Sequence, residues 1–179
     1  MRRGCIVATT FIVAVLATGG WWLVGRRDGA TSLDAEPAHL AVRWRGKYQG
    51  AMTLPARINW CPGTRHGILE AISGDSGVAV VLYERDSLTS GAHLVASPDL
   101  AASIQAPGAT VVMRWMRTGR DTAITGFRSQ GGTVAISFAS GLGSGDINAR
   151  MRAASGSDTL VVRGAFRDVP VVTTAAGCN

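Results

Sequence analysis

From His39 onward the chain alternates hydrophobic and polar residues with a period of two. This period places successive side chains on opposite faces of an extended strand, so each such segment is predicted to be a β-strand with one buried face. Pro55 has no backbone N–H and indicates an edge strand or a bulge in one of them. The main predicted strands are residues 39–45, 52–60, 77–84, 109–116, 121–127, 132–138, 146–151 and 158–166.

The spacing of these segments, with turns rich in Gly, Ser and Asp between them, is typical of an all-β domain. We predict an antiparallel β-sandwich or barrel of about 8–9 short strands over residues 39–179. Residues 145–166 form its clearest hairpin. The one helical candidate lies between Ser97 and Ala106, where Ser97 is a suitable N-cap and Pro98 a suitable first residue of a short helical turn.

An uncharged segment precedes this domain, from Gly4 to Gly25. As a helix, its 22 residues extend about 33 Å, which matches a hydrocarbon core of about 30 Å. Trp21 and Trp22 fall near one end, where indole rings favour the headgroup region, and Arg26 and Arg27 follow. We therefore expect a transmembrane anchor over residues 1–27 and a linker over residues 28–38.

The same segment also fits a cleavable signal peptide, with Ala17 and Gly19 as the small residues before the cut. A cut there would leave an exposed apolar start, GWWLVG, so a retained anchor is the preferred interpretation. Lys and Arg residues near the two ends are almost balanced, and the positive-inside rule alone does not orient the segment. The secretion-like start favours a bacterial inner-membrane protein with a cytoplasmic N-terminus and a periplasmic domain.

The net charge of +6 comes largely from the anchor. Four arginines flank the apolar segment, which leaves 14 of the 18 basic residues against 12 acidic ones from residue 28 onward. A nucleic-acid-binding domain usually carries a basic stripe with interleaved aromatic residues. The sequence has no such run, so we expect no nucleic acid as a partner. Because four arginines flank the apolar segment, we expect a lipid bilayer and integral membrane subunits as partners.

Cys61 and Cys178 are the two cysteines outside the apolar segment. They bracket the β domain, and a disulfide between them is predicted because such a bond would close most of the domain into one loop. Disulfides persist in oxidising compartments such as the periplasm. Two unrelated buried thiols are the alternative.

No motif in the sequence indicates a reaction. Residues 74–77, GDSG, resemble the segment around the nucleophile of chymotrypsin-like serine proteases, but a serine without a base is a weak nucleophile, so a turn between strands is expected. His39, His66 and His93 are dispersed and are expected to be surface or loop residues. Residues 141–146, GLGSGD, are expected to form a flexible hairpin loop. We predict no catalytic residue, cofactor or metal site.

Trp44, Trp60 and Trp115 lie in alternating segments and are expected to fill the core. A protein contact is the alternative, because Trp beside Arg, as in Arg43-Trp44-Arg45 and Arg114-Trp115, is enriched at interfaces.

The layout of an apolar span, CIVATTFIVAVLATGGWWLVG, followed by a small β domain resembles small non-pigment subunits of bacterial photosynthetic reaction-centre and antenna complexes. The resemblance covers the anchor and the layout and includes no diagnostic motif. It implies a single-pass subunit that stabilises the complex without catalysis, and it assigns no functional residue. The alternative is a membrane-tethered or secreted extracytoplasmic binding module, a β-sandwich or barrel that holds a small or apolar ligand inside.

Overall fold

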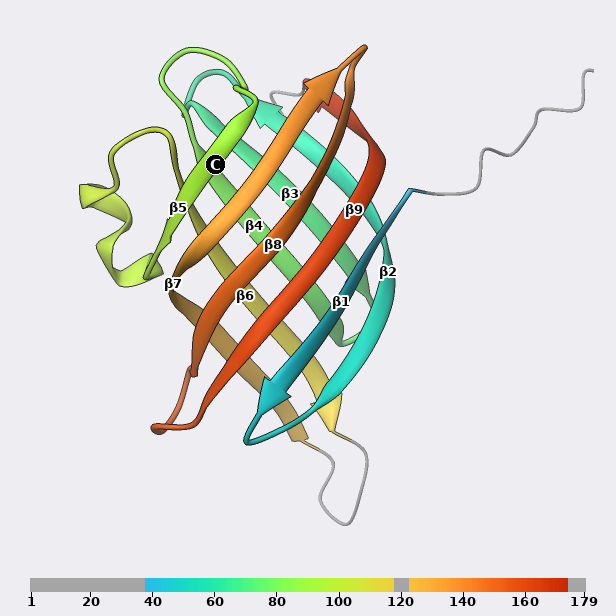
Figure 1. The fold of residues 1–179 in the computed structure, drawn as a ribbon, viewed down its shortest axis with the longest axis vertical. Helices are drawn as coiled ribbons and strands as arrows, with labels where there is room; N and C mark the ends of the chain where they lie inside the picture. The colour runs from blue at the N-terminus through green and yellow to red at the C-terminus, as the bar shows by residue number, and fades with distance from the viewer. Residues whose placement is uncertain (1–37, 118–122, 174–179) are drawn as a thin grey trace, which may run out of the picture. The chain divides into compact units, whose positions relative to one another are not determined.

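The structure, a computed structural model, describes residues 38–117 and 123–173, which form an all-β domain (Figure 1). The predicted anchor (1–27), the linker up to residue 37, and Cys178 lie outside the described residues. The elements are β1 (His39–Gly46), β2 (Gly50–Cys61), β3 (His66–Ser73), β4 (Ser76–Tyr83), β5 (Gly91–Ala96), the 3₁₀ helix η1 (Pro98–Ser103), β6 (Gly108–Arg117), β7 (Ala123–Ala139), β8 (Leu142–Ala153) and β9 (Thr159–Thr173).

The nine strands form one sheet that closes into a barrel in the order β1-β2-β3-β4-β6-β5-β7-β8-β9. This confirms the all-β prediction and selects the barrel over the sandwich. The sheet is mixed, however, and not purely antiparallel as predicted. The first residues of β6 pair in parallel with β5, and the last residues of β9 pair in parallel with β2.

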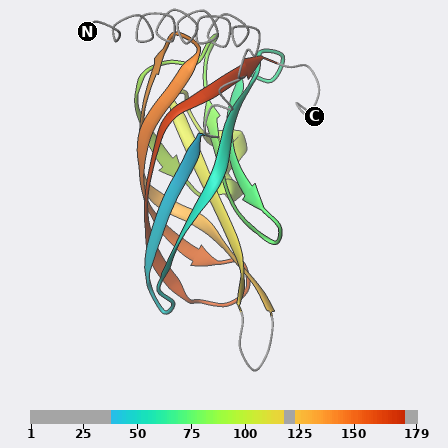
Figure 2. The ribbon, with the colours of Figure 1, turned by 90° about the vertical axis from the view of Figure 1, so that its right-hand side faces the viewer.

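The two parallel pairings arise because β1 and β5 each cover only part of the barrel's length. β9 pairs with β1 through Leu160–Phe166 and then reaches past it to pair with β2 at Val171–Thr173. Figure 2 shows this arrangement, with the red end of β9 beside the upper half of β2 and the blue strand β1 below. In the same way, β7 pairs first with β6 and then with β5.

Pro55 lies where the pairing of β2 changes. Residues Ala56–Cys61 pair with β3, and the preceding half of β2 pairs with β1. The N–H of Ala56 donates to the carbonyl of Ala38, on the β1 side (2.7 Å). Because N–H groups alternate sides along a strand, the nitrogen of Pro55 faces the β3 side, where the ladder ends. Proline therefore occupies an edge position, as its missing donor predicts.

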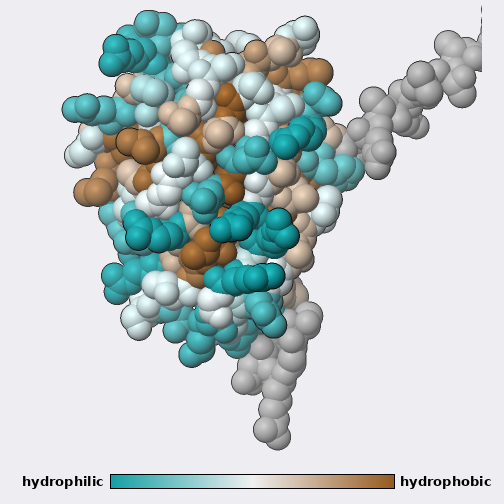
Figure 3. All heavy atoms as spheres, in the orientation of Figure 1, coloured by the Kyte–Doolittle hydropathy of each residue, from teal (hydrophilic) through white to brown (hydrophobic). Residues whose placement is uncertain are grey.

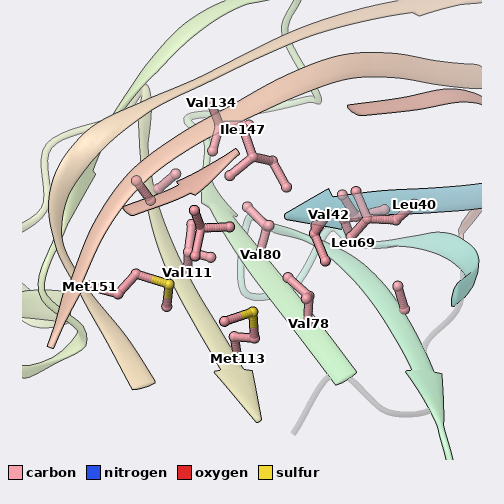
Figure 4. Packing of buried hydrophobic residues seen from close by; sticks show 14 of the residues in the cluster. Leu40, Val42, Leu69, Val78, Val80, Val111, Met113, Val134, Ile147 and Met151 are labelled. Carbon is pink, nitrogen blue, oxygen red and sulfur yellow. The ribbon is translucent and has the colours of Figure 1, made fainter. Parts of the chain in front are cut away.

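The inward side chains fill the barrel with one hydrophobic cluster. Figure 4 shows residues from opposite walls, such as Leu40, Val80 and Met151, pointing toward one another. All three are at most 1 % exposed. Burial of such side chains stabilises a fold by about 1.5–3 kcal/mol each, so the alternation along each strand defines which face turns inward.

Two segments predicted as connections are parts of strands. Residues 129–131 lie within β7, where a bulge between Ser129 and Gly131 bends one long strand in place of a loop. Residues 142–146 of the predicted hairpin loop lie within β8, and the actual turn is Ser140-Gly141, both with positive φ (51° and 77°). A turn with two positive φ values suits the twist of a two-residue hairpin.

The predicted helical turn is confirmed as η1, with Ser97 as its N-cap and Pro98 as its first residue. The predicted hairpin at residues 145–166 is confirmed as β8–β9. In the part of the chain that the structure describes, no helix is long and apolar enough to span a bilayer.

Candidate docking surface

Trp44 and Trp115 lie inside the barrel. Each is at most 8 % exposed, and their ring centroids are 4.8 Å apart. Trp115 also stacks on Phe127 (5.3 Å), and the edge of Tyr48 meets both of these rings. Core filling therefore holds for both tryptophans, and their interpretation as a partner contact is wrong, because the strand period turns them inward.

Arg43 and Arg45 remain from the predicted contact, and both are exposed on the outer face. They alternate along β1 with the buried residues Val42 and Trp44. The same residue pattern that buries the tryptophan thus places the two arginines outside, where a partner has access to them.

The closure of the barrel gathers three more arginines around these two. On β9, Arg163 is the direct cross-strand partner of Arg43, and on β8, Arg150 lies one strand further, opposite Val161. We call the set Arg43, Arg45, Arg150, Arg152 and Arg163 the arginine face; all five are exposed. Figure 3 shows the corresponding cluster of hydrophilic side chains on the lower half of this side of the barrel, around an apolar spot.

The nearby carboxylates are paired with other cations. Asp158 lies 3.8 Å from the amine of Lys47, and Asp146 lies 3.4 Å from a guanidinium nitrogen of Arg167. Within residues 38–117 and 123–173, none of the five members of the arginine face has a carboxylate within ion-pairing distance. The face is therefore an accumulation of uncompensated positive charge.

A hollow of about 530 Å³ adjoins the arginine face. Arg43 and Arg163 border it on one side, and Asp146 and Asn148 border it on another strand. Its lining includes small residues in cross-strand positions on the outer face of the sheet: Ala41, Thr53 and Ala165. The short side chains leave room beside the guanidinium groups that a partner's side chain can occupy.

A buried polar cluster lies elsewhere, and sequence analysis missed it. His93 is fully buried on β5, and its Nε2 lies 2.8 Å from Oε1 of Glu84, which follows β4. Thr89 donates to the same carboxyl group through its hydroxyl (2.8 Å) and its backbone N–H (3.1 Å). The expectation that His93 is a surface or loop residue is therefore wrong. The alternation His93-Leu94-Val95, in which the exposed Leu94 separates two buried side chains, was the available signal.

The remaining motif candidates are separated from one another. GDSG forms the turn between β3 and β4, as expected, and His66 lies at the opposite end of β3 from this turn. His39, His66 and His93 lie on β1, β3 and β5. Across the described ranges, no group of three His, Cys, Asp or Glu side chains is arranged to hold a metal ion.

Cys61 is fully buried at the end of β2. Its neighbour Trp60 pairs with Thr173, the final residue of β9. Cys178 follows five positions later (178 minus 173) and lies outside the described residues, as do Trp21, Trp22, Arg26 and Arg27. The parallel β2–β9 pairing brings the chain near Cys61 shortly before Cys178, and the disulfide between them stays a prediction.

We find no match for this chain among known protein families, curated proteins or solved structures.

Proposed function

We propose that the chain is a non-catalytic, single-pass membrane subunit that stabilises a multi-subunit membrane complex through the outer surface of its barrel. The uncharged segment from Gly4 to Gly25 anchors it in a bacterial inner membrane, with the N-terminus in the cytoplasm and the barrel in the periplasm. The layout resembles non-pigment subunits of photosynthetic complexes, so a reaction-centre or antenna complex is the first partner to examine.

The observation that carries this proposal is the contrast between the barrel's interior and its surface. The interior holds a hydrophobic cluster that includes Phe166, Leu40 and Ile58, all at most 1 % exposed. The arginine face, in contrast, presents five guanidinium groups without carboxylate partners. A filled interior and an uncompensated outer face favour binding of a partner on the outside.

A scaffold role also agrees with how the barrel is built. Several of its strands are joined by short turns, such as the two-residue connection between β7 and β8. A closed sheet has few free edges and changes shape little, and rigid surfaces lose little conformational freedom when they bind. These properties suit a brace between other subunits.

The test is co-purification of the tagged, full-length chain after gentle solubilisation of native membranes. We expect it to migrate with integral membrane subunits in fixed stoichiometry, while an unrelated single-span protein with the same tag migrates alone. Migration of the chain as a monomer under several mild detergents would contradict the proposal.

Two buried nitrogen atoms favour a second candidate, a binding module with a small ligand inside the barrel. Nε1 of Trp44 and Nδ1 of His93 have no hydrogen-bond partner among the described residues. Unsatisfied buried polar atoms are uncommon, and a bound polar molecule is one way to satisfy them. Native mass spectrometry of the purified chain tests this: a reproducible mass increment that is lost on unfolding supports the module, and the bare mass contradicts it.

A further inference from the structure

We propose that the arginine face binds a carboxylate-rich surface of a partner subunit, with Arg43 and Arg163 as the pair that receives a carboxylate. This inference rests on the proposed function, because it names the chemistry by which the barrel would dock in a complex.

The charge balance of the arginine face favours an anionic partner. Arg43 and Arg163 occupy directly opposite positions on adjacent antiparallel strands. Opposite residues have Cβ atoms about 4.5–5.5 Å apart, and like charges in such positions repel each other. Neither arginine has a carboxylate within ion-pairing distance among the described residues, and Asp146, which lines the same hollow, is paired with Arg167. An anion held between the two guanidinium groups would remove it.

The geometry of the two guanidinium groups favours a carboxylate as that anion. A guanidinium presents its N–H donors as a planar fork that matches the two oxygens of a carboxylate. Two such forks on neighbouring strands can hold one carboxylate from both sides. Arg45 and Arg150 extend the charge on the two sides of Val161, so a second acidic side chain has a place next to the first.

Two further features favour a protein surface over a layer of anionic lipid headgroups as the partner. The hollow beside Arg43 also carries the side-chain amide of Asn148, and its carboxylate, Asp146, is already paired with Arg167, so it offers a neutral hydrogen-bonding group beside the arginines. Val161, 41 % exposed, supplies an apolar contact among the charges. An apolar centre with a charged surround and an adjoining hollow is typical of a protein–protein contact.

The test uses the full-length chain in native membranes and a carbodiimide, which forms an amide between a lysine amine and a carboxylate in contact with it. Lys47 is the only lysine in the sequence, so every variant carries Lys47→Arg. Arg43→Lys and Arg163→Lys each place one amine in the arginine face and keep its charge. The matched control is Arg85→Lys, because Arg85 is also exposed and has no ion pair among the described residues, but lies after β4.

We expect the Arg43→Lys and Arg163→Lys variants to form an adduct that mass spectrometry maps to an Asp or Glu of an integral membrane subunit. The Arg85→Lys control should form none above background. The adduct should be lost when the salt concentration is raised to about 1 M before coupling, since the Debye length is then about 3 Å.

Three outcomes would overturn the inference. Equal adducts at the control position would show non-specific coupling. No adduct at either test position, in a chain that still co-purifies with its complex, would show that the complex is bound through another surface, and the proposed function would stand. The third outcome is a lipid site: no adduct forms, and phosphatidylglycerol in phosphatidylcholine nanodiscs raises the melting temperature of the wild-type chain but not that of an Arg43→Glu/Arg163→Glu variant.

Discussion

At the scale of single residues, the most constrained positions are polar groups inside the barrel. Glu84 and His93 are both nearly inaccessible to water, with side-chain exposures of 2 % and 1 %. Glu84 therefore depends on His93 and Thr89, and His93 depends on Glu84, for the hydrogen bonds that water would otherwise supply. A buried polar group that loses its partner bears the full cost of its desolvation, whereas loss of both partners removes most of that cost.

His93→Leu should lower the free energy of unfolding by about 1–3 kcal/mol, because it leaves the Glu84 carboxyl group buried without its ring partner. The double variant Glu84→Leu/His93→Leu should be less destabilised than the sum of its single variants. Urea unfolding of all three proteins measures the coupling. Additive effects would contradict a direct interaction between the two side chains.

Ser129→Ala should cost about 1–3 kcal/mol for the same reason. The buried hydroxyl donates to the carbonyl of Ala96 on β5 and accepts from the N–H of Val111 on β6 (3.0 Å). The exposed Ser137→Ala is the control and should change stability by less than about 0.5 kcal/mol. Equal unfolding free energies for the two variants would mean that Ser129 does not join these strands.

At the scale of elements, the barrel is shaped by the point where β7 changes its pairing partner from β6 to β5, which we call the fork. β7 leaves β6 near Arg128 and meets β5 at Gly132, and the bulge between Ser129 and Gly131 lies at this change of partner. A bulge bends its strand and increases the local twist, which lets one strand serve two neighbours in succession. The fork thus explains why two predicted strands form a single one.

Gly132→Ala should destabilise the fork, because Gly132 has a φ of +133° and an added Cβ would collide with the carbonyl oxygen of Asn148 on β8. The strain of such a backbone conformation costs about 1–3 kcal/mol before the collision is counted. Gly63→Ala is the matched control, since a Cβ there meets nothing within 4 Å. Thermal unfolding should rank Gly132→Ala far below Gly63→Ala, and similar melting temperatures would contradict the argument.

At the scale of the whole molecule, the first and last strands meet. β9 closes the barrel against β1 and then against β2, so residues far apart in sequence share one outer face. The same closure forms the arginine face and brings the end of β9 near Cys61. The proposed partner binding and the predicted disulfide therefore both depend on this seam of the barrel.

Reduction of the predicted Cys61–Cys178 disulfide should lower the free energy of unfolding by about 4–5 kcal/mol, as expected for a loop of more than 100 residues. Comparison of the unfolding midpoints with and without reductant measures this difference. A Cys178→Ser variant should match the reduced protein. Modification of both cysteines by a thiol reagent in the unreduced, unfolded chain would contradict the prediction.

Arg163→Gln should leave the stability of the isolated chain unchanged or raise it by about 0.2–1 kcal/mol, because it relieves the like-charge contact with Arg43. The same change should weaken association with the partner complex. Urea unfolding and co-purification of one variant test both halves. A clear loss of stability would show that the two arginines do not repel each other in the folded chain.

Local pattern alone determined that the domain is all-β, and it determined which side of each strand is buried. The alternation Val42-Arg43-Trp44-Arg45 was sufficient for this, because inward and outward positions follow from a period that a few residues define. Tertiary structure alone decided that the sheet closes, that it is mixed, and which residues face one another across it. Pairing of Arg43 with Arg163 and of Glu84 with His93 depends on strand register and chain reversal, which carry no periodic signal in sequence.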